Sequence, residues 1–171
     1  MKMTETMLAD LERELPASRR VLERVPEGKF DWKPHPKSMP MGYLATLVAT
    51  MPSWIETMVK QDELDFAPKE KGGSGYRPPE ARTPSEWIRA LDESTERARA
   101  ALRGTTDSHL ATNWRLMAGG HVVSELPRHV NIRDGVLSHW AHHRGQLTVY
   151  LRLNDVPVPS VYGPTADERV G

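Results

Sequence analysis

Apolar residues recur at intervals of three and four along four separate stretches of the chain, which is the spacing of an amphipathic α-helix. The first stretch ends at Pro26-Glu27-Gly28, where the composition stops a helix. The second contains Pro52, which should bend it. The third begins with a capping box of Thr83 and Glu86. We therefore predict helices over residues 1–25, 38–60, 84–104 and 132–153.

The period changes between residues 112 and 126, where Gly119-Gly120 separates two short apolar runs and predicts a β-hairpin. Ser38 is the expected N-cap of the second helix. Residues 62–82 contain a Gly-Gly-Ser-Gly group and two adjacent prolines, and predict a long exposed loop. The expected fold is all-α: a four-helix bundle with a small β-hairpin before the last helix, in a single domain spanning residues 1–171.

Composition limits the possible partners. The 171 residues include 23 Lys and Arg against 23 Asp and Glu, so no charge excess favours nucleic acid or a membrane surface. Cysteine is absent, which excludes a disulfide framework and a catalytic thiol. No stretch has the roughly 18 apolar residues of a membrane span, and the N-terminal residues do not resemble a signal peptide. We expect a soluble, cytoplasmic protein that binds neither membranes nor nucleic acid.

The most informative chemistry lies in the last predicted helix. His139 and His143 are four residues apart, so they project from one face of the helix about one turn apart. On a helical wheel both lie in the middle of the apolar stripe, whereas His142 falls about 60° away, at its edge. Two buried imidazoles require partners. A metal ion, a hydrogen-bond network or a water-filled pocket would each provide them, and the spacing alone leaves these alternatives open.

Four segments of the sequence are distinctive: HWAHHRGQLTVYLRLNDVPVPSVYGPTADE (residues 139–168), WKPHPKSM (residues 32–39), PSW (residues 52–54) and the predicted hairpin with Trp114, Gly119-Gly120 and Pro127-Arg128. The first closely resembles the C-terminal signature of the DinB family, the damage-inducible-like proteins of the DinB/YfiT superfamily, and the other three fit the same family. The resemblance covers nearly the whole chain.

The resemblance implies a four-helix bundle, commonly dimeric, in which three histidines hold a divalent metal such as nickel or zinc. Two of these ligands match His139 and His143, and the third comes from the second helix. The corresponding segment here is GYLATLVATMPSW (residues 42–54), which places Leu47 at the third position. Leucine cannot bind a metal, so we expect an incomplete two-histidine site. His121, His35 or a carboxylate could replace the missing ligand.

Two classes of function are consistent with these observations. The first is a stress-associated protein, non-catalytic or weakly metal-binding, that binds a small apolar molecule or a partner chain. The alternative is a metal-dependent hydrolase or a thiol-dependent transferase or isomerase with His139 and His143 as ligands. We assign no catalytic residue. For the homodimer that we expect, the back of the last helix offers the small residues Ala141, Gly145 and Thr148.

Overall fold

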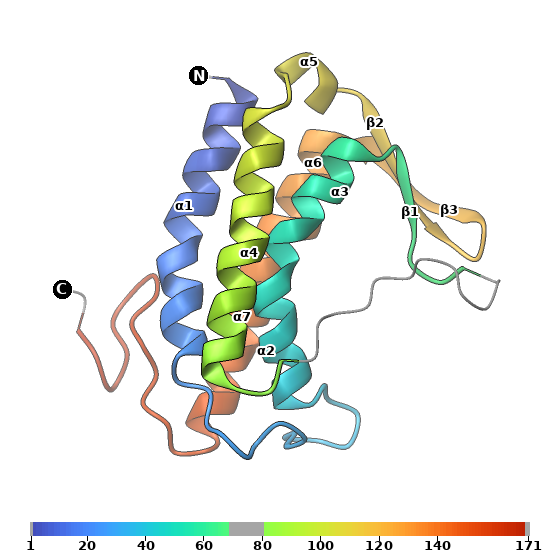
Figure 1. Cartoon of the computed structure of the whole chain (residues 1–171). Coiled ribbons are helices and arrows are strands. Elements are labelled where there is room, and N and C mark those ends of the chain that lie inside the picture. The colour runs from blue at the N-terminus through green and yellow to red at the C-terminus, as the bar shows by residue number, and fades with distance from the viewer. Residues whose placement is uncertain (1, 69–80, 170–171) are drawn as a thin grey trace.

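The computed structural model describes residues 2–68 and 81–169. Four long helical segments run side by side, and a small sheet extends from one end of them (Figure 1). The long segments are α1 (Met3–Leu22), α2 and α3 (Met41–Thr50 and Trp54–Lys60), α4 (Pro84–Arg103), and α6 and α7 (Arg128–Ile132 and His139–Arg152). The shorter elements are α5 (Asp107–Leu110), β1 (Glu63–Asp65), β2 (Asn113–Ala118) and β3 (His121–Pro127).

Helix α2 lies at the centre of the core, because all of its residues except Tyr43 are buried. Two tryptophans attach neighbouring helices to it. The indole of Trp87 in α4 donates a hydrogen bond of 3.0 Å to the Thr46 hydroxyl. The indole of Trp140 in α7 donates one of 2.7 Å to the Val48 carbonyl. Buried N–H groups need such partners. The two bonds therefore fix the positions of α4 and α7 along α2.

The second predicted helix is present but interrupted. A 3₁₀ turn, η1 (Met51–Ser53), separates α2 from α3, and it contains Pro52, where the sequence predicts a bend. A proline removes one backbone donor, which favours such a local change. The predicted N-cap at Ser38 is wrong. The Ser38 N–H closes a turn on the His35 carbonyl, and Pro40 precedes the first helical residue, Met41.

The last helical segment starts earlier than predicted, at Arg128, and it is not uniformly α-helical. A π-helical stretch, η2 (Arg133–Ser138), joins α6 to α7 directly before His139. A π turn inserts an extra residue and shifts the helical phase of the residues after it. The wheel drawn for a continuous helix therefore misplaces residues before η2 relative to those in α7.

The predicted helical fold with a hairpin is confirmed in part, but the all-α class needs correction, because the hairpin is part of a three-stranded mixed sheet. Strands β2 and β3 form the predicted antiparallel hairpin, and β1 pairs with β2 in parallel. Gly119 and Gly120 have φ of 59° and 81°, which glycine tolerates better than other residues. Strand β1 lies in the stretch predicted to be a loop; residues 69–80 of that stretch are outside the described residues. The fold is thus mostly helical with a small sheet.

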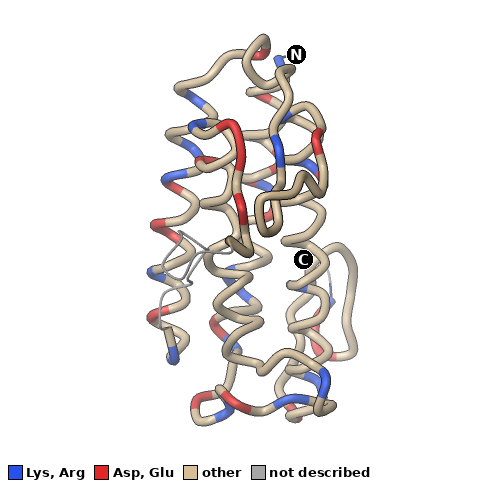
Figure 2. Tube along the Cα trace, turned by 90° about the vertical axis from the view of Figure 1, so that its right-hand side faces the viewer, with Lys and Arg blue, Asp and Glu red and all other residues tan. Residues whose placement is uncertain are grey.

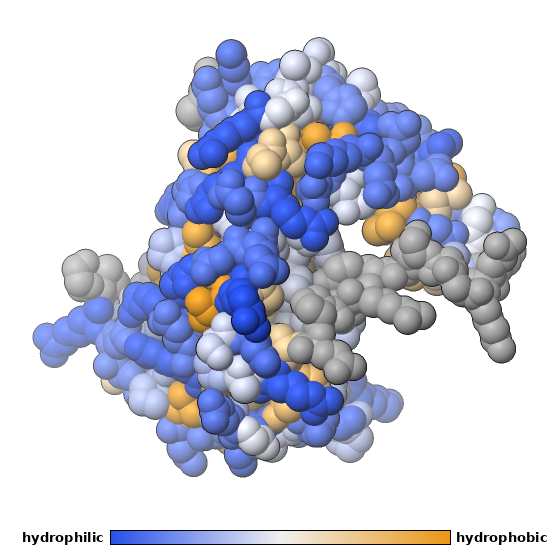
Figure 3. All heavy atoms as spheres, in the orientation of Figure 1, coloured by the Kyte–Doolittle hydropathy of each residue, from blue (hydrophilic) through white to orange (hydrophobic). Residues whose placement is uncertain are grey.

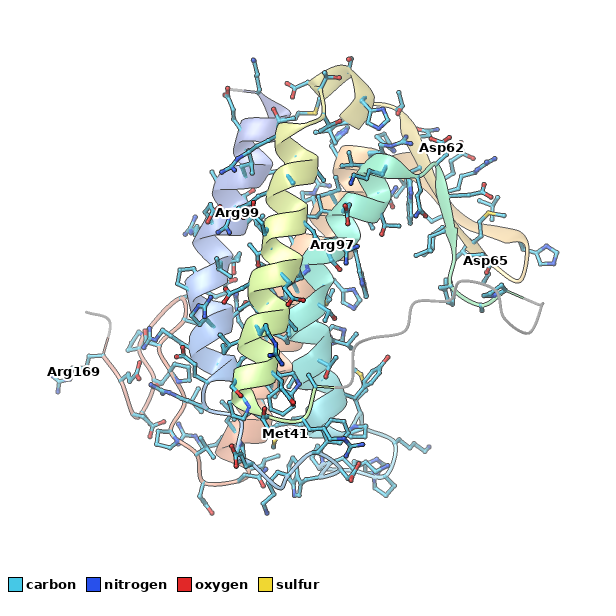
Figure 4. All side chains as sticks on the ribbon, viewed as in Figure 1. Met41, Asp62, Asp65, Arg97, Arg99 and Arg169 are labelled. Atoms are coloured by element: carbon cyan, nitrogen blue, oxygen red, sulfur yellow. The ribbon has the colours of Figure 1, made fainter. Side chains whose placement is uncertain are left out.

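Ion pairs join the helices on the outside of the molecule. Arg99 of α4 points toward α1 and binds Glu12 through two nitrogens at 2.5 and 2.7 Å (Figure 4). Arg97 points toward α3, where its Nε lies 2.6 Å from Glu56. Charges of both signs are interspersed along the face shown in Figure 2.

The segment after α7 returns along α1 and is held by charged contacts. Glu168 pairs with Arg20 and Arg24, and Val158 inserts into the core. The Tyr162 hydroxyl bonds to Glu14 of α1 and to Arg144 of α7. Arg144 is only 1% exposed and donates further bonds to α1. This buried arginine therefore links α1, α7 and the C-terminal segment.

Candidate functional site

The predicted pair of histidines lies on the first turns of α7, with its rings side by side. The ring centroids of His139 and His143 are 4.4 Å apart, and the ring planes are inclined by 42°. His143 is 6% exposed, whereas His139 is half-buried and lies 6.2 Å from the ring of Trp54 at the start of α3. The i, i+4 spacing thus brings the two imidazoles together between α7 and the α2–α3 segment.

The environment of His143 favours its neutral form. Burial lowers the pKa of His143, and the neighbouring His139 and His142 act in the same direction. A hydrogen bond of 2.8 Å between its Nδ1 and the Gln146 Oε1 acts in the opposite direction. Only a neutral imidazole keeps a lone pair with which it can bind a metal or accept a hydrogen bond. The neutral form that burial favours for His143 is therefore the form that both metal binding and hydrogen-bond acceptance require.

The position at which the family resemblance expects a third ligand holds an apolar side chain. Leu47 is buried, with 7% of its surface exposed. Its neighbour Val48 accepts the hydrogen bond from Trp140, which follows His139 directly, so this turn of α2 faces the start of α7. Within residues 2–68 and 81–169, no group of three His, Cys, Asp or Glu side chains is arranged to hold a metal. The donors present do not fit a three-histidine site.

The other candidate histidines lie elsewhere. His121 is exposed at the start of β3, near Asp65 at the tip of the sheet. His35 is exposed in the connection between α1 and α2, where its Nδ1 accepts the N–H of Lys37 at 3.1 Å. His142 is exposed, with its ring centroid 5.2 Å from that of His143. None of them completes a metal site with the pair among the described residues.

Sequence reasoning did not identify two residues of the site. Gln146, which binds His143, is three positions further along α7, and that i, i+3 spacing could have indicated it. The apolar spacing places Trp54 in the core, but its ring also neighbours His139. The π-helical η2 gave no indication in the apolar pattern, although such turns are frequent at functional sites.

The surface of the molecule adds two observations. The face shown in Figure 3 is largely hydrophilic, with hydrophobic residues in small separate areas. Among the described residues, none of the helices has the length and apolar character that crossing a membrane would require.

Comparison with known proteins gives structural matches only. No model of a protein family matches the sequence, and no curated protein matches it either. A DinB-like protein from Bacillus cereus ATCC 10987 superimposes with a TM-score of 0.67 at 21% identity, over 92% of this chain and 97% of that one. The DinB-like protein YjoA from Bacillus subtilis gives a TM-score of 0.66 at 15% identity, over 96% and 99% of the two chains.

These matches cover nearly the whole chain, and they agree with the resemblance found in the C-terminal sequence. At such identities they establish the arrangement of the helices and not an activity. The chain therefore has the fold of the DinB-like proteins.

Proposed function

We propose that this protein is a DinB-like, stress-associated protein whose metal site is incomplete, so that it binds nickel or zinc weakly and catalyses no reaction through a bound metal. The observation that carries the proposal is the absence of a third His, Cys, Asp or Glu ligand beside His139 and His143 in the described part of the chain. Leu47 stands at the position where the resemblance expects that ligand.

The coordination chemistry supports weak binding. Structural zinc sites have four protein ligands, and catalytic ones usually have three and an open position. Two imidazoles leave at least two positions of a tetrahedral ion to water. The ion therefore dissociates more easily than it does from a site with three or four protein ligands. A buried leucine also provides no hydrogen bond to a metal-bound water. The two histidines can still accept a hydrogen bond. We propose that the ligand of the metal-free site is a small molecule that donates one.

One observation favours the alternative, a metal-dependent hydrolase or a thiol-dependent transferase or isomerase. The contact of His143 Nδ1 with Gln146 resembles the outer hydrogen bond that most metal-binding histidines make. In that case His139 and His143 would hold the ion, and a third ligand, which the described residues do not provide, would have to come from the substrate or from water.

The test compares the affinity for zinc and nickel of untagged wild-type protein and the Leu47→His variant. We expect the variant to bind at least ten times more tightly, which corresponds to about 1.4 kcal/mol. Leu47→Asn controls for added polarity, and Leu47→His/His139→Ala should lose the gain if the new ligand acts with the pair. Tight, stoichiometric binding by the wild type would refute the proposal.

We further propose that the protein forms a homodimer through the outer face of α7. Gly145 is exposed there, and the side chains of Val149 and Leu153 are each 56% exposed at i, i+4 spacing. Apolar residues in one row on a helix can pack against a second copy. Location in the cytoplasm and the absence of nucleic-acid and membrane partners remain predictions from the sequence.

A further inference from the structure

The contact between Gln146 and His143 indicates which nitrogen of the imidazole carries the proton. The Gln146 Oε1 lies 2.8 Å from the Nδ1 of His143. An amide oxygen can only accept a hydrogen bond, so Nδ1 must be the donor. A neutral imidazole carries one N–H, and its Nε2 is then left with a lone pair.

We propose that Gln146 is a positioning residue that holds His143 in the Nδ1–H tautomer, so that the site offers the Nε2 lone pair to its ligand. The inference deepens the proposed function and relies on it only in placing His143 in the binding site. A lone pair selects ligands that accept electrons or donate hydrogen bonds. The metal-free site would thus bind an O–H or N–H group in preference to a carboxylate or phosphate.

The chemistry of residue 146 fits this role. A glutamate there would also accept the Nδ1 proton, but its charge would stabilise the imidazolium form, which has no lone pair. The neutral amide fixes the tautomer without favouring the second proton. His143 is nearly fully buried, so water competes little with the amide for the same nitrogen.

The tautomer can be measured on metal-free protein. Two-bond ¹H–¹⁵N correlation spectra at about pH 8, above the usual histidine pKa of about 6.5, distinguish Nδ1–H from Nε2–H. The His143 signals are those lost in His143→Ala and kept in His142→Ala. We expect Nδ1–H in the wild type and a mixed or Nε2–H state in Gln146→Met, which has a similar shape without an acceptor. An Nε2–H wild type, or an unchanged Gln146→Met, would overturn the inference.

A second measurement separates positioning from folding. In the Leu47→His background, Gln146→Met should weaken zinc binding about 10- to 100-fold, as the loss of outer hydrogen bonds usually does. Gln146→Glu should retain zinc binding at a pH high enough to keep His143 neutral, because its carboxylate also accepts the Nδ1 proton. An unchanged affinity in Gln146→Met contradicts the inference. If Gln146→Met does not fold, the wild-type tautomer still decides. Tight zinc binding by the wild type refutes the proposed function and leaves the tautomer result intact, whereas a wrong tautomer refutes only this inference.

Discussion

The variant Arg144→Met, which lacks a buried arginine, should unfold at clearly lower urea concentrations than the wild type. The guanidinium is 1% exposed and pairs with the Glu14 carboxylate. It also donates hydrogen bonds of 3.1 Å to the Glu14 carbonyl and to the Ser18 hydroxyl. Methionine fills much of the same volume but provides none of these bonds. The Glu14 carboxylate, whose side chain is 16% exposed, then loses its cationic partner.

The expected cost results from that loss. Removing one partner of a buried ion pair costs about 3–5 kcal/mol. Glu14 keeps the bond from the Tyr162 hydroxyl at 2.6 Å, which places the expectation at the lower end, about 3 kcal/mol. This is a large share of the roughly 5–15 kcal/mol by which folded domains are stable.

Urea denaturation followed by tryptophan fluorescence measures the difference. The double variant Arg144→Met/Glu14→Leu should recover to within about 1.5 kcal/mol of the wild type, because apolar residues often replace a buried pair without loss. Arg99→Met is the control, since its pair with Glu12 is partly exposed and should contribute less than about 1 kcal/mol. The reasoning is refuted if Arg144→Met loses no more free energy of unfolding than Arg99→Met does. It is also refuted if the double variant is no more stable than Arg144→Met alone.

Three further predictions concern the C-terminal segment, the packing of α2 and the α7 face. The hydrogen bond from Arg24 lowers the pKa of Glu168 from its usual 4.5 to about 2. The ionised Glu168 therefore contributes fully to stability above about pH 4.5, and this contribution disappears as the pH falls toward 2. In acid denaturation, Glu168→Gln should reduce the loss of stability over that range; an unchanged profile contradicts this. Gly42→Ala would bring a Cβ within 2.1 Å of the Phe30 ring and should cost about 1–3 kcal/mol, whereas the Cβ in Gly163→Ala would meet nothing within 4 Å and should not destabilise the protein in the same denaturation assay. Light scattering should show a wild-type dimer and a Val149→Asp monomer, and a monomeric wild type or a dimeric variant would exclude the proposed interface.

Much of the helical architecture can be predicted from local sequence. Regular apolar spacing predicts the four long segments, and the Thr83–Glu86 capping box forms as expected, with both reciprocal bonds present. The Gly119-Gly120 turn also forms, because glycine at positive φ is a local requirement. Such features depend on neighbours in the chain, and a single sequence is sufficient to show them.

The missed features depend on partners distant in sequence. Strand β1 has three residues and exists through its pairing with β2, about 50 positions later, so its own sequence does not indicate a strand. The π-helical η2 escapes notice because Ile132, Val136 and His139 already fit an α-helical spacing. The proximity of the two histidines was predictable from i, i+4 spacing, whereas the role that we propose for Leu47 depends on the family resemblance.

If Leu47 is the reason that the histidine pair binds metal weakly, zinc should stabilise the Leu47→His variant more than the wild type. Leu47→His buries an imidazole and should lose about 1–3 kcal/mol of metal-free stability. Zinc at 100 times the dissociation constant of the variant should then add about 2.7 kcal/mol to the variant, and at most about 1.4 kcal/mol to the wild type, whose affinity for zinc we expect to be at least ten times lower. Equal stabilisation of both proteins by zinc, or of neither, would contradict a role of Leu47 in weakening metal binding.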